Sequence, residues 1–513
     1  MPGSESFRLR TILLSGALTA LLWRPAAATT QDHPGCETSD AKACVASAMD
    51  AMGGRQTLEA LSSARLELID HTALVEQSYR QAPFITAYDR VTQIVDFKTG
   101  RVGADYRSWW PESDPDMASA ESSGKLVATP TGAVSRGDKA DTPGPLSAID
   151  AAAARLALGP ERLLLTAWAA SDLHFAADET IRGTPHTTVA FTWNGAPIRV
   201  LLNPFNHLPD AMESTRTFND FWFAWGDVRQ RVYFDNWKLI AGVVYPTNWV
   251  EERNDIPWKS TQVLDAKFNT TVDPAALAMD GDAAAKSAAS KGWDRPFEAA
   301  APVTLAPGIE FYSGAWNVTV IRQPDGLVIL EAPISPAFTA AVLAKARADH
   351  PQLPIKAVLS SSDSWPHAAG VREAVAQNLP VYILDLNRPL LERLVAAPHS
   401  RKPDDLETHP QTADWRIVAG SEALGVGPNR IVLYPIRGAS TERQYMVYFP
   451  ERRLLYASDT LVIDQDKHAL YDPELMREVA QAVARENLTV DTVFAMHEGP
   501  TPWSEVKRLL SSG

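Results

Sequence analysis

Between residues 45 and 275, hydrophobic positions alternate with polar ones over short stretches that are rich in aromatic side chains. Residues 221–225 (FWFAW) and 231–234 (RVYF) are two such stretches. Turn sequences such as Asn194-Gly195 separate them, and an Asn-Gly pair between alternating runs is typical of a hairpin. Residues 111–146 are instead rich in Ser, Asp, Gly and Pro, and we expect a mobile excursion there. The pattern predicts a β-rich region.

From about residue 299, hydrophobic runs of strand length alternate with helical periods. We predict strands at residues 317–322, 327–331, 355–359, 381–384, 445–449, 454–457 and 492–495. We predict helices at residues 336–348 and 371–378, and two more that begin at Asp472-Pro473 and Thr501-Pro502. Residues 276–298 carry small and polar side chains without an apolar period, so we expect a linker.

The chain of 513 residues has ample apolar material for a core, with 45% hydrophobic and 21% charged residues, and its length favours more than one domain. Its formal net charge of −14 argues against a nucleic-acid partner, because phosphate contacts need clustered Lys and Arg. Arg8 and Arg10, the apolar residues 11–23 and the alanines at 26–28 are typical of a secretory signal peptide cut after Ala28. We therefore expect an exported protein, periplasmic or secreted, with no transmembrane segment after signal removal.

The chain has two cysteines, Cys36 and Cys44, and both follow the predicted cleavage site. Two thiols are too few for a structural zinc site, and in an oxidising compartment they would close a small loop. We predict a disulfide between them, which bears on location rather than on chemistry.

Three separated segments of the C-terminal region resemble the metallo-β-lactamase superfamily. Residues 327–333 (LVILEAP) resemble its second strand and acidic turn, residues 448–459 (YFPERRLLYASD) its hairpin with a metal-bridging Asp, and residues 493–500 (VFAMHEGP) its last ligand strand. The resemblance implies a four-layer αββα fold over residues 299–513. It also implies a cluster of His and Asp ligands, suited to zinc, at one edge of the sheet.

The main metal motif of that superfamily, His-x-His-x-Asp-His, falls on residues 362–367 of this chain and is mostly lost. Its first two histidines correspond to Ser362 and Ser364, its aspartate to Pro366, and only the last histidine is kept, as His367. The remaining histidine of the first metal site would fall on or near Ser440. Because a serine hydroxyl is a poor zinc ligand, the resemblance implies at most one metal ion.

The second site of the family keeps His367, Asp459 and His497, with Asp363 as a further candidate ligand. These residues either hold one divalent ion, zinc by preference, with a position open for water, or persist as a hydrogen-bonded cluster without metal. His468 lies near Asp464 and could line the same mouth.

Two further readings of polar residues carry less weight. Ser362 and its serine neighbours could suggest a nucleophile with His367 as base, but the chain has no Gly-x-Ser-x-Gly elbow. His399 and His409 lie in a polar stretch, and we expect them to be solvated.

The N-terminal region loosely resembles lipoprotein-carrier proteins, which are curved antiparallel half-barrels with an apolar concave face. Residues 52–61, 198–204 and 237–246 carry this resemblance. Several tryptophans could line such a cavity or pack the sheet against its helix: Trp109, Trp110, Trp222, Trp225, Trp237 and Trp249. The cavity alternative would support a lipid-like ligand.

The sequence thus predicts an α+β multidomain protein: a signal peptide (residues 1–28), a β-rich half-barrel (29–275), a linker (276–298) and a metallo-β-lactamase-like domain (299–513). Two functions follow. One is a divergent exported hydrolase of an ester, lactone or amide, with at most one metal ion and no organic cofactor. The alternative is a non-catalytic member that binds a hydrophobic ligand or a protein partner.

Overall fold

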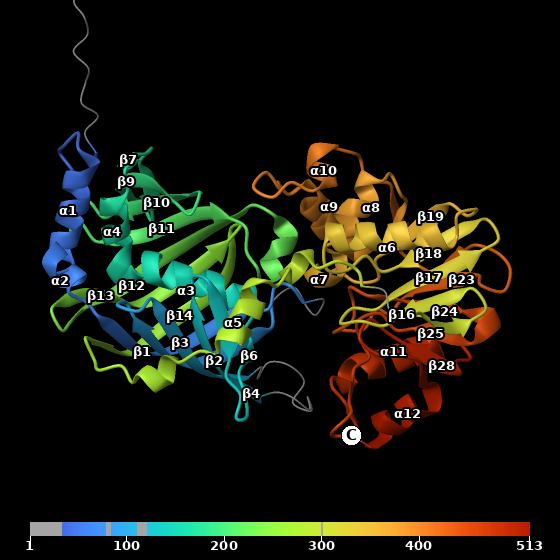
Figure 1. Ribbon diagram of the computed structural model, residues 1–513. Helices are drawn as coiled ribbons and strands as arrows, with labels where there is room; N and C mark the ends of the chain where they lie inside the picture. Colours follow the sequence, from blue (N-terminus) through green and yellow to red (C-terminus); the bar gives the residue numbers. More distant parts are fainter. Residues whose placement is uncertain (1–32, 78–83, 110–120, 299–300, 513) are drawn as a thin grey trace, which may run out of the picture.

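The computed structural model describes residues 33–77, 84–109, 121–298 and 301–512 (Figure 1). The predicted signal peptide lies outside these residues. Among the helices that are described, none combines the length and the apolar character needed to cross a bilayer.

A fourteen-stranded sheet dominates the N-terminal region, and all its pairings are antiparallel. Thirteen strands follow the order β6-β5-β4-β3-β2-β1-β14-β13-β12-β11-β10-β9-β7, and β8 also pairs with β9. The predicted hairpin is confirmed, because Asn194 and Gly195 join β9 to β10 with φ of 47° and 71°, a conformation that suits these two residue types. The strands are β1 (Ser63–Ala73), β2 (Thr86–Asp96), β3 (Arg101–Trp109), β4 (Glu121–Thr129), β5 (Gly132–Ser135), β6 (Thr142–Pro143), β7 (His174–Phe175), β8 (Glu179–Ile181), β9 (Thr184–Trp193), β10 (Ala196–Leu202), β11 (Pro209–Arg216), β12 (Val228–Ile240), β13 (Val243–Arg253) and β14 (Ile256–Phe268).

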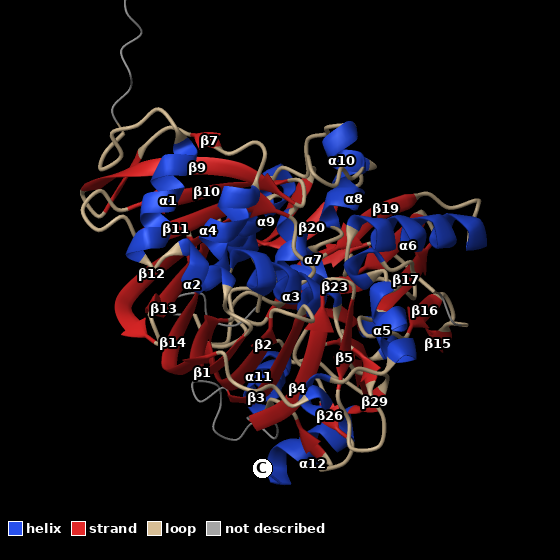
Figure 2. Ribbon diagram, turned by 60° about the vertical axis from the view of Figure 1, so that its left-hand side comes forward, coloured by secondary structure: helices blue, strands red, loops and turns tan. Residues whose placement is uncertain are grey.

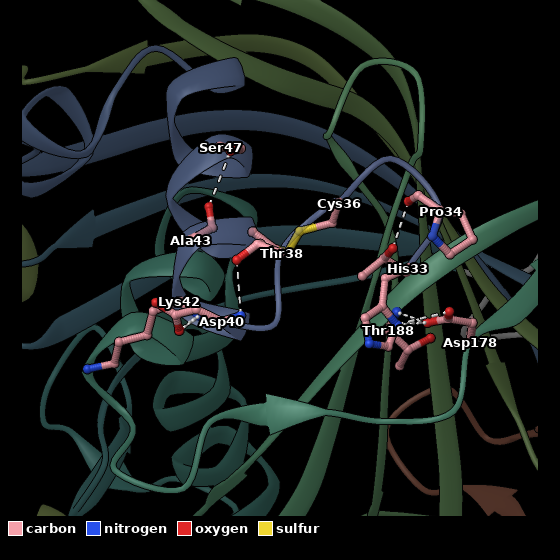
Figure 3. The surroundings of a disulfide bond; sticks show 12 residues. His33, Pro34, Cys36, Thr38, Asp40, Lys42, Ala43, Ser47, Asp178 and Thr188 are labelled. Atoms are coloured by element: carbon pink, nitrogen blue, oxygen red, sulfur yellow. Dashed lines mark hydrogen bonds and ion pairs between the residues drawn. A yellow bond between two sulfur atoms is a disulfide. The ribbon is translucent and has the colours of Figure 1, made fainter. Parts of the chain in front are cut away.

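Four helices pack against this sheet: α1 (Ala41–Ala51), α2 (Arg55–Glu59), α3 (Leu146–Leu158) and α4 (Pro160–Ala169) (Figure 1). Met49 and Leu163 from these helices share a core with Phe191 and Tyr245 from the strands. Figure 3 shows the disulfide between Cys36 and Cys44, which ties the segment before α1 to that helix, so this prediction is confirmed.

The expectation of an excursion at residues 111–146 is wrong for residues 121–143, which form β4, β5 and β6 at one end of the sheet. Val127 and Val134 are buried there against Leu277 and Ala283. Leu277 belongs to η2 (Pro274–Leu277) and Ala283 to α5 (Gly281–Ala288). The segment at residues 276–298, predicted as a linker, therefore covers this end of the sheet with a helix. Residues 110–120 lie outside the described residues.

Residues 221–225 are a 3₁₀ helix, η1 (Phe221–Trp225), and the predicted strand is wrong. Asp220 caps it by accepting a hydrogen bond from the Trp222 backbone N–H at 3.0 Å. Trp222 and Trp225 pack edge-on against Trp365 of the C-terminal region, which explains why apolar side chains crowd this segment.

Three further tryptophans among the described residues pack on the sheet. Trp237 and Trp249 lie half-buried against its core, and Trp109 stacks on Tyr88. Trp110 lies outside the described residues.

Two larger sheets and a two-stranded hairpin, β26 (Ile463–Asp464) with β27 (Ala469–Leu470), form the C-terminal region (Figure 2). The seven-stranded sheet has the order β15-β16-β17-β18-β19-β20-β21 and is parallel from β18 to β21. The six-stranded sheet has the order β22-β23-β24-β25-β28-β29, in which only β25 and β28 are parallel. Their strands are β15 (Val303–Ala306), β16 (Ile309–Tyr312), β17 (Val318–Gln323), β18 (Gly326–Leu330), β19 (Ile355–Leu359), β20 (Val381–Leu384), β21 (Trp415–Val418), β22 (Glu422–Leu424), β23 (Ile431–Pro435), β24 (Tyr445–Phe449), β25 (Leu454–Tyr456), β28 (Thr492–Phe494) and β29 (Thr501–Pro502).

Three cores order these elements. Phe311 and Leu359 of the first sheet share a core with Val447 and Phe494 of the second, so the two sheets pack face to face. A second core joins the seven-stranded sheet to α6 (Pro336–Asp349), α8 (Val371–Ala376) and α9 (Arg388–Ala396), and a third joins the six-stranded sheet to α11 (Pro473–Arg485) and α12 (Trp503–Ser512).

The predicted strands and helices of this region are confirmed to within a few residues at their ends. Taken together, the described residues form an α+β protein in which antiparallel pairing predominates.

Candidate metal centre

Three chain segments, each of which follows a strand, bring His367, Asp459 and His497 together. His367 lies in the short helix α7 (Trp365–Ala368), which follows β19 after a buried loop. Asp459 follows β25 and His497 follows β28. Because β25 and β28 pair in parallel, the segments after them emerge at the same edge of the sheet.

The three side chains form one compact cluster. Each offers one ligand atom, and these atoms all lie within 4.8 Å of one another. The Nε2 atoms of His367 and His497 are 3.2 Å apart, and His497 Nε2 lies 3.3 Å from Asp459 Oδ1. His367 Nδ1 lies 3.5 Å from Asp459 Oδ2. The His367 side chain is 4% exposed and the His497 side chain 27%, so the cluster opens on one side.

The second nitrogen of His497 fixes its tautomer. Its Nδ1 lies 2.9 Å from the carbonyl oxygen of Ala315, which only accepts hydrogen bonds, so Nδ1 carries the proton. In the neutral ring the Nε2 lone pair then faces His367 and Asp459, and such a backbone hydrogen bond is the usual way in which a metal-binding histidine is oriented.

The electrostatics of the cluster favour a neutral His367 and an ionised Asp459, and they shift His497 towards its protonated form. Burial lowers the pKa of His367 to about 4, so its ring is neutral near pH 7. Burial acts the same way on His497, but its hydrogen bond with Asp459 outweighs this and raises the pKa above the usual value. Burial would raise the pKa of Asp459, yet the adjacent His367 and His497 hold it below the usual range.

The donor set fits a single zinc ion. In a tetrahedral zinc site with bonds near 2.0–2.1 Å, neighbouring ligand atoms are about 3.3 Å apart. Two of the three separations between ligand atoms, 3.2 and 3.3 Å around His497 Nε2, match that edge, and the third lies within 4.8 Å. Two imidazole nitrogens and one carboxylate oxygen also form a ligand set that leaves a fourth position open.

Asp363, the further candidate ligand, does not join this cluster. Its carboxylate is fully buried and forms an ion pair with Arg443 at 2.9 Å. Ser362 Oγ lies 3.4 Å from His367 Nδ1, while Ser364 and Pro366 line the cavity beside the cluster. Ser440, at the place of the lost histidine, donates its backbone N–H to Glu478.

A cavity of about 210 Å³ lies over the cluster. The three candidate ligands line it together with Gln77, Phe221, Trp316, Ser364, Pro366, Thr460, Val462, Tyr471, Asp472 and Leu475. Gln77 and Phe221 come from the N-terminal region, so both regions contribute to its wall. His468 is not among the lining residues, although the residues on either side of its hairpin, Val462 and Tyr471, are.

Sequence reasoning missed a buried polar group below the cluster. Glu331 is 1% exposed, accepts hydrogen bonds from the Ser361 hydroxyl and from Tyr456 Oη at 3.0 Å, and has a raised pKa of about 7 because of burial. Ser361 in turn lies 2.7 Å from Ser458, the residue before Asp459. An acidic residue at the end of a fully apolar strand was the only signal that could have pointed to it.

The expectation of a solvated His399 is also wrong. This residue is 6% exposed, and burial lowers its pKa to about 4. Its ring packs so closely on Gly226 that a Cβ there would lie 2.4 Å from it. His409 is exposed, as expected.

No known family model matches the chain, and no curated protein matches it. Among solved structures, the neighbours include a metallo-β-lactamase from Hirschia baltica, with 16% identity over 42% of this chain and 97% of that chain and a TM-score of 0.31. The metallo-β-lactamase DIM-1 has 16% identity over 42% of this chain and 99% of its own, with a TM-score of 0.33.

A third neighbour is the inverting sec-alkylsulfatase Pisa1 from Pseudomonas sp. The match has 14% identity, covers 41% of this chain and 40% of that chain, and has a TM-score of 0.31. This chain thus matches well under half of the alkylsulfatase. The structural neighbours named here are metallo-β-lactamases and an alkylsulfatase.

Proposed function

We propose that this chain is a hydrolase that holds one divalent ion, zinc by preference, between His367, Asp459 and His497. The observation that carries the proposal is the convergence of three ligand atoms within 4.8 Å at the floor of a cavity. When bound, the ion would supply Lewis-acid chemistry, polarising a carbonyl and making a water molecule more acidic.

The chain's own residues divide the remaining tasks. The Ala315 carbonyl fixes the ring of His497, and burial keeps His367 neutral and able to bind metal. Asp472, which lines the same cavity, is the acidic group that would take up a proton during hydrolysis. Hydrolysis of an ester, lactone or amide would then consume one water and break the bond from the acyl carbon to oxygen or nitrogen.

The alternative is a non-catalytic protein that binds a hydrophobic ligand or a protein partner. It is favoured by the contacts of the cluster, because the His367 and His497 Nε2 atoms lie within hydrogen-bond distance at 3.2 Å and both rings lie 3.3–3.5 Å from the Asp459 carboxylate, an arrangement that needs no ion. The loss of ligands at Ser362, Ser364 and Pro366 points the same way.

Zinc stoichiometry separates the two. We expect elemental analysis of the mature protein to give one ion per chain, lost in His367→Ala and retained in His409→Ala, whose histidine is exposed and outside the cluster. An ion-free wild type after purification in zinc would retire the hydrolase and leave the binding function. A positive result justifies a screen of esters, lactones and amides, with and without chelator.

We further propose the organisation of the chain. Residues 29–275 would form a half-barrel domain, 276–298 a connection and 299–513 a four-layer αββα domain of the metallo-β-lactamase type. The single-metal site would then be the degenerate form of that family's centre. The face-to-face packing of the two C-terminal sheets between helices supports this assignment. Limited proteolysis should cut within residues 276–298 if this segment connects two independent domains.

Export is the last part of the proposal. The Cys36–Cys44 disulfide supports an oxidising compartment, periplasmic or extracellular. Mass spectrometry of the N-terminus of the protein recovered outside the cytoplasm should place the first residue at Thr29. An intact Met1 on that protein would contradict the signal peptide.

A further inference from the structure

A second, larger cavity opens beside the metal centre, and we call it the Trp293 groove. Its volume is about 510 Å³, and its principal walls are Leu146, Asn219, Phe221, Trp293, Arg295 and Trp316. Phe221 and Trp316 also line the cavity over the candidate metal ligands, so the two cavities share a wall. A molecule in the groove would therefore contact Phe221 and Trp316, which also line the cavity over the candidate metal ligands.

Aromatic rings form a continuous surface from the groove to the metal centre. Phe221 and Trp293 lie 5.4 Å apart between ring centroids, and Trp293 and Trp316 lie 5.6 Å apart. Trp316 then meets the ring of His497 edge-on at 5.9 Å. Such a surface binds an apolar body, because aromatic side chains bury large apolar areas at little cost in conformational entropy.

One positive charge in the groove, that of Arg295, has no ion-pair partner among the described residues. The Arg295 guanidinium lies 5.1 Å from the ring centroid of Trp316 and 5.8 Å from that of Trp293. It is half-buried and lacks an ion-pair partner among the residues that the structure describes, and burial alone lowers its pKa. The nearby carboxylates are already engaged, since Asp220 binds Arg253 at 2.7 Å and Asp294 contacts Lys402.

The other polar groups of the groove wall add hydrogen-bond donors. The indole N–H of Trp316 is buried and has no hydrogen-bond partner within the described part of the chain. Lys291 is exposed at the same wall. The Trp293 indole N–H differs, because it donates to the Asn219 carbonyl oxygen at 3.2 Å. An unpaired guanidinium with further donors around it recognises an oxyanion.

We propose that the Trp293 groove binds an amphiphilic anion, with its oxyanion group on Arg295 and its apolar body along Trp293 and Trp316. This inference rests on the proposed function in one respect, because it takes the amphiphilic anion to be the kind of substrate that the metal centre would hydrolyse. Its recognition, however, uses residues that belong to neither the metal cluster nor its ligands, so binding is measurable without metal.

The probe is dodecanoate, with dodecanol as its uncharged counterpart, titrated into chelator-treated full-length mature protein by calorimetry. We expect wild type to bind dodecanoate at least tenfold more tightly than dodecanol, with an affinity that falls as salt is added. Arg295→Gln should lose about tenfold in dodecanoate affinity and leave dodecanol binding unchanged, and Arg295→Lys should keep part of the preference.

The matched control is Arg416→Gln, which removes the same charge from an exposed arginine on β21 and should bind dodecanoate as wild type does. Equal affinity of wild type for dodecanoate and dodecanol overturns the inference, as does an Arg295→Gln variant that binds dodecanoate normally. If zinc does not bind but dodecanoate is still selected through Arg295, the anion site stands and only the hydrolase is lost.

Discussion

The indole rings of Trp365 and Trp222 meet edge-on with their centroids 4.7 Å apart, and both side chains are almost fully buried. Trp365 lies two residues before His367 in α7, whereas Trp222 belongs to η1, which precedes β12 of the large sheet. The candidate metal ligand thus sits on a helix that is held in place by a residue from the other half of the chain.

Removing that support should weaken both folding and the metal centre. We expect Trp222→Ala to lower the free energy of unfolding by about 3–5 kcal/mol, the usual cost of deleting a large buried aromatic side chain. Zinc affinity should fall in the same variant, while Trp222→Phe keeps most of both. The measurements are chemical denaturation and zinc titration of the folded variant. Unchanged zinc affinity in a destabilised Trp222→Ala would show that α7 holds its position without this contact.

Asp459 is the charged candidate ligand of the cluster, so its neutralisation should act on metal binding more than on folding. We expect Asp459→Asn to weaken zinc binding more than tenfold, because a neutral amide is a far poorer ligand than a carboxylate. Competition with a chromophoric chelator measures this. Asp464→Asn, on the following hairpin, is the matched control and should bind zinc normally; equal losses in both would point to a general effect of charge.

Arg372, in α8, connects this helix to the end of α9 and to Asp404. It is 1% exposed, holds Asp404 through two hydrogen bonds of 2.6 and 2.9 Å, and donates to the Val395 and Ala397 carbonyls. Arg372→Lys cannot keep this fork, so we expect a loss of about 3–5 kcal/mol in unfolding free energy. Arg388→Lys, on the exposed face of α9, should change stability by less than about 0.5 kcal/mol. Similar denaturation curves for the two variants would contradict this role.

Local patterns predicted most of the C-terminal elements because those strands are buried on both faces and their helices have clear start signals. The three candidate ligands were predicted from the resemblance to the superfamily's motifs, and the local pattern placed only the strands that precede them. The hydrogen-bonded Glu331 could not be found this way, since its partners Ser361 and Tyr456 come from distant segments.

The failed predictions share one cause, which is contact between segments far apart in sequence. The aromatic run at residues 221–225 has the composition of a strand, but it is buried against Trp365 and turns as a 3₁₀ helix. His399 lies in a polar stretch, yet Gly226 leaves room for its ring in the interior. Neither contact has a local signature.

The disulfide should contribute to stability through the unfolded chain. Cys36 and Cys44 are separated by eight positions, and closing a loop of that length is worth about 2–3 kcal/mol in the chain-entropy model. We expect the double variant Cys36→Ser/Cys44→Ser to lose that amount in denaturation experiments, and dithiothreitol to have the same effect on wild type but none on the variant. A reductant effect on the double variant would rule out this disulfide as its source.

Glu331 should make stability depend on pH in a direction opposite to that of a salt-bridged carboxylate. Burial raises its pKa from an ordinary 4.5 to about 7, although hydrogen bonds from Ser361 and Tyr456 act the other way. Between these pH values the folded state binds more protons than the unfolded state, so this contribution is fully present below pH 4.5 and is lost as the pH rises through 7. The loss amounts to about 3 kcal/mol for a shift of this size.

Glu331→Gln stays neutral throughout, so its unfolding free energy, measured in chelator, should lack this decline between pH 4.5 and 7.5. Its absolute stability at low pH should fall only slightly, because the Ser361 and Tyr456 hydroxyls both donate to Oε1, which the amide keeps, and the amide nitrogen replaces only Oε2, the acceptor of the Ser361 backbone N–H at 3.4 Å. Glu451→Gln, at an exposed position on the β24–β25 turn, should follow the wild-type profile. If Glu331→Gln also follows the wild-type profile, the titrating group lies elsewhere. Glu76 is then the next residue to replace, because burial raises its pKa to about 7.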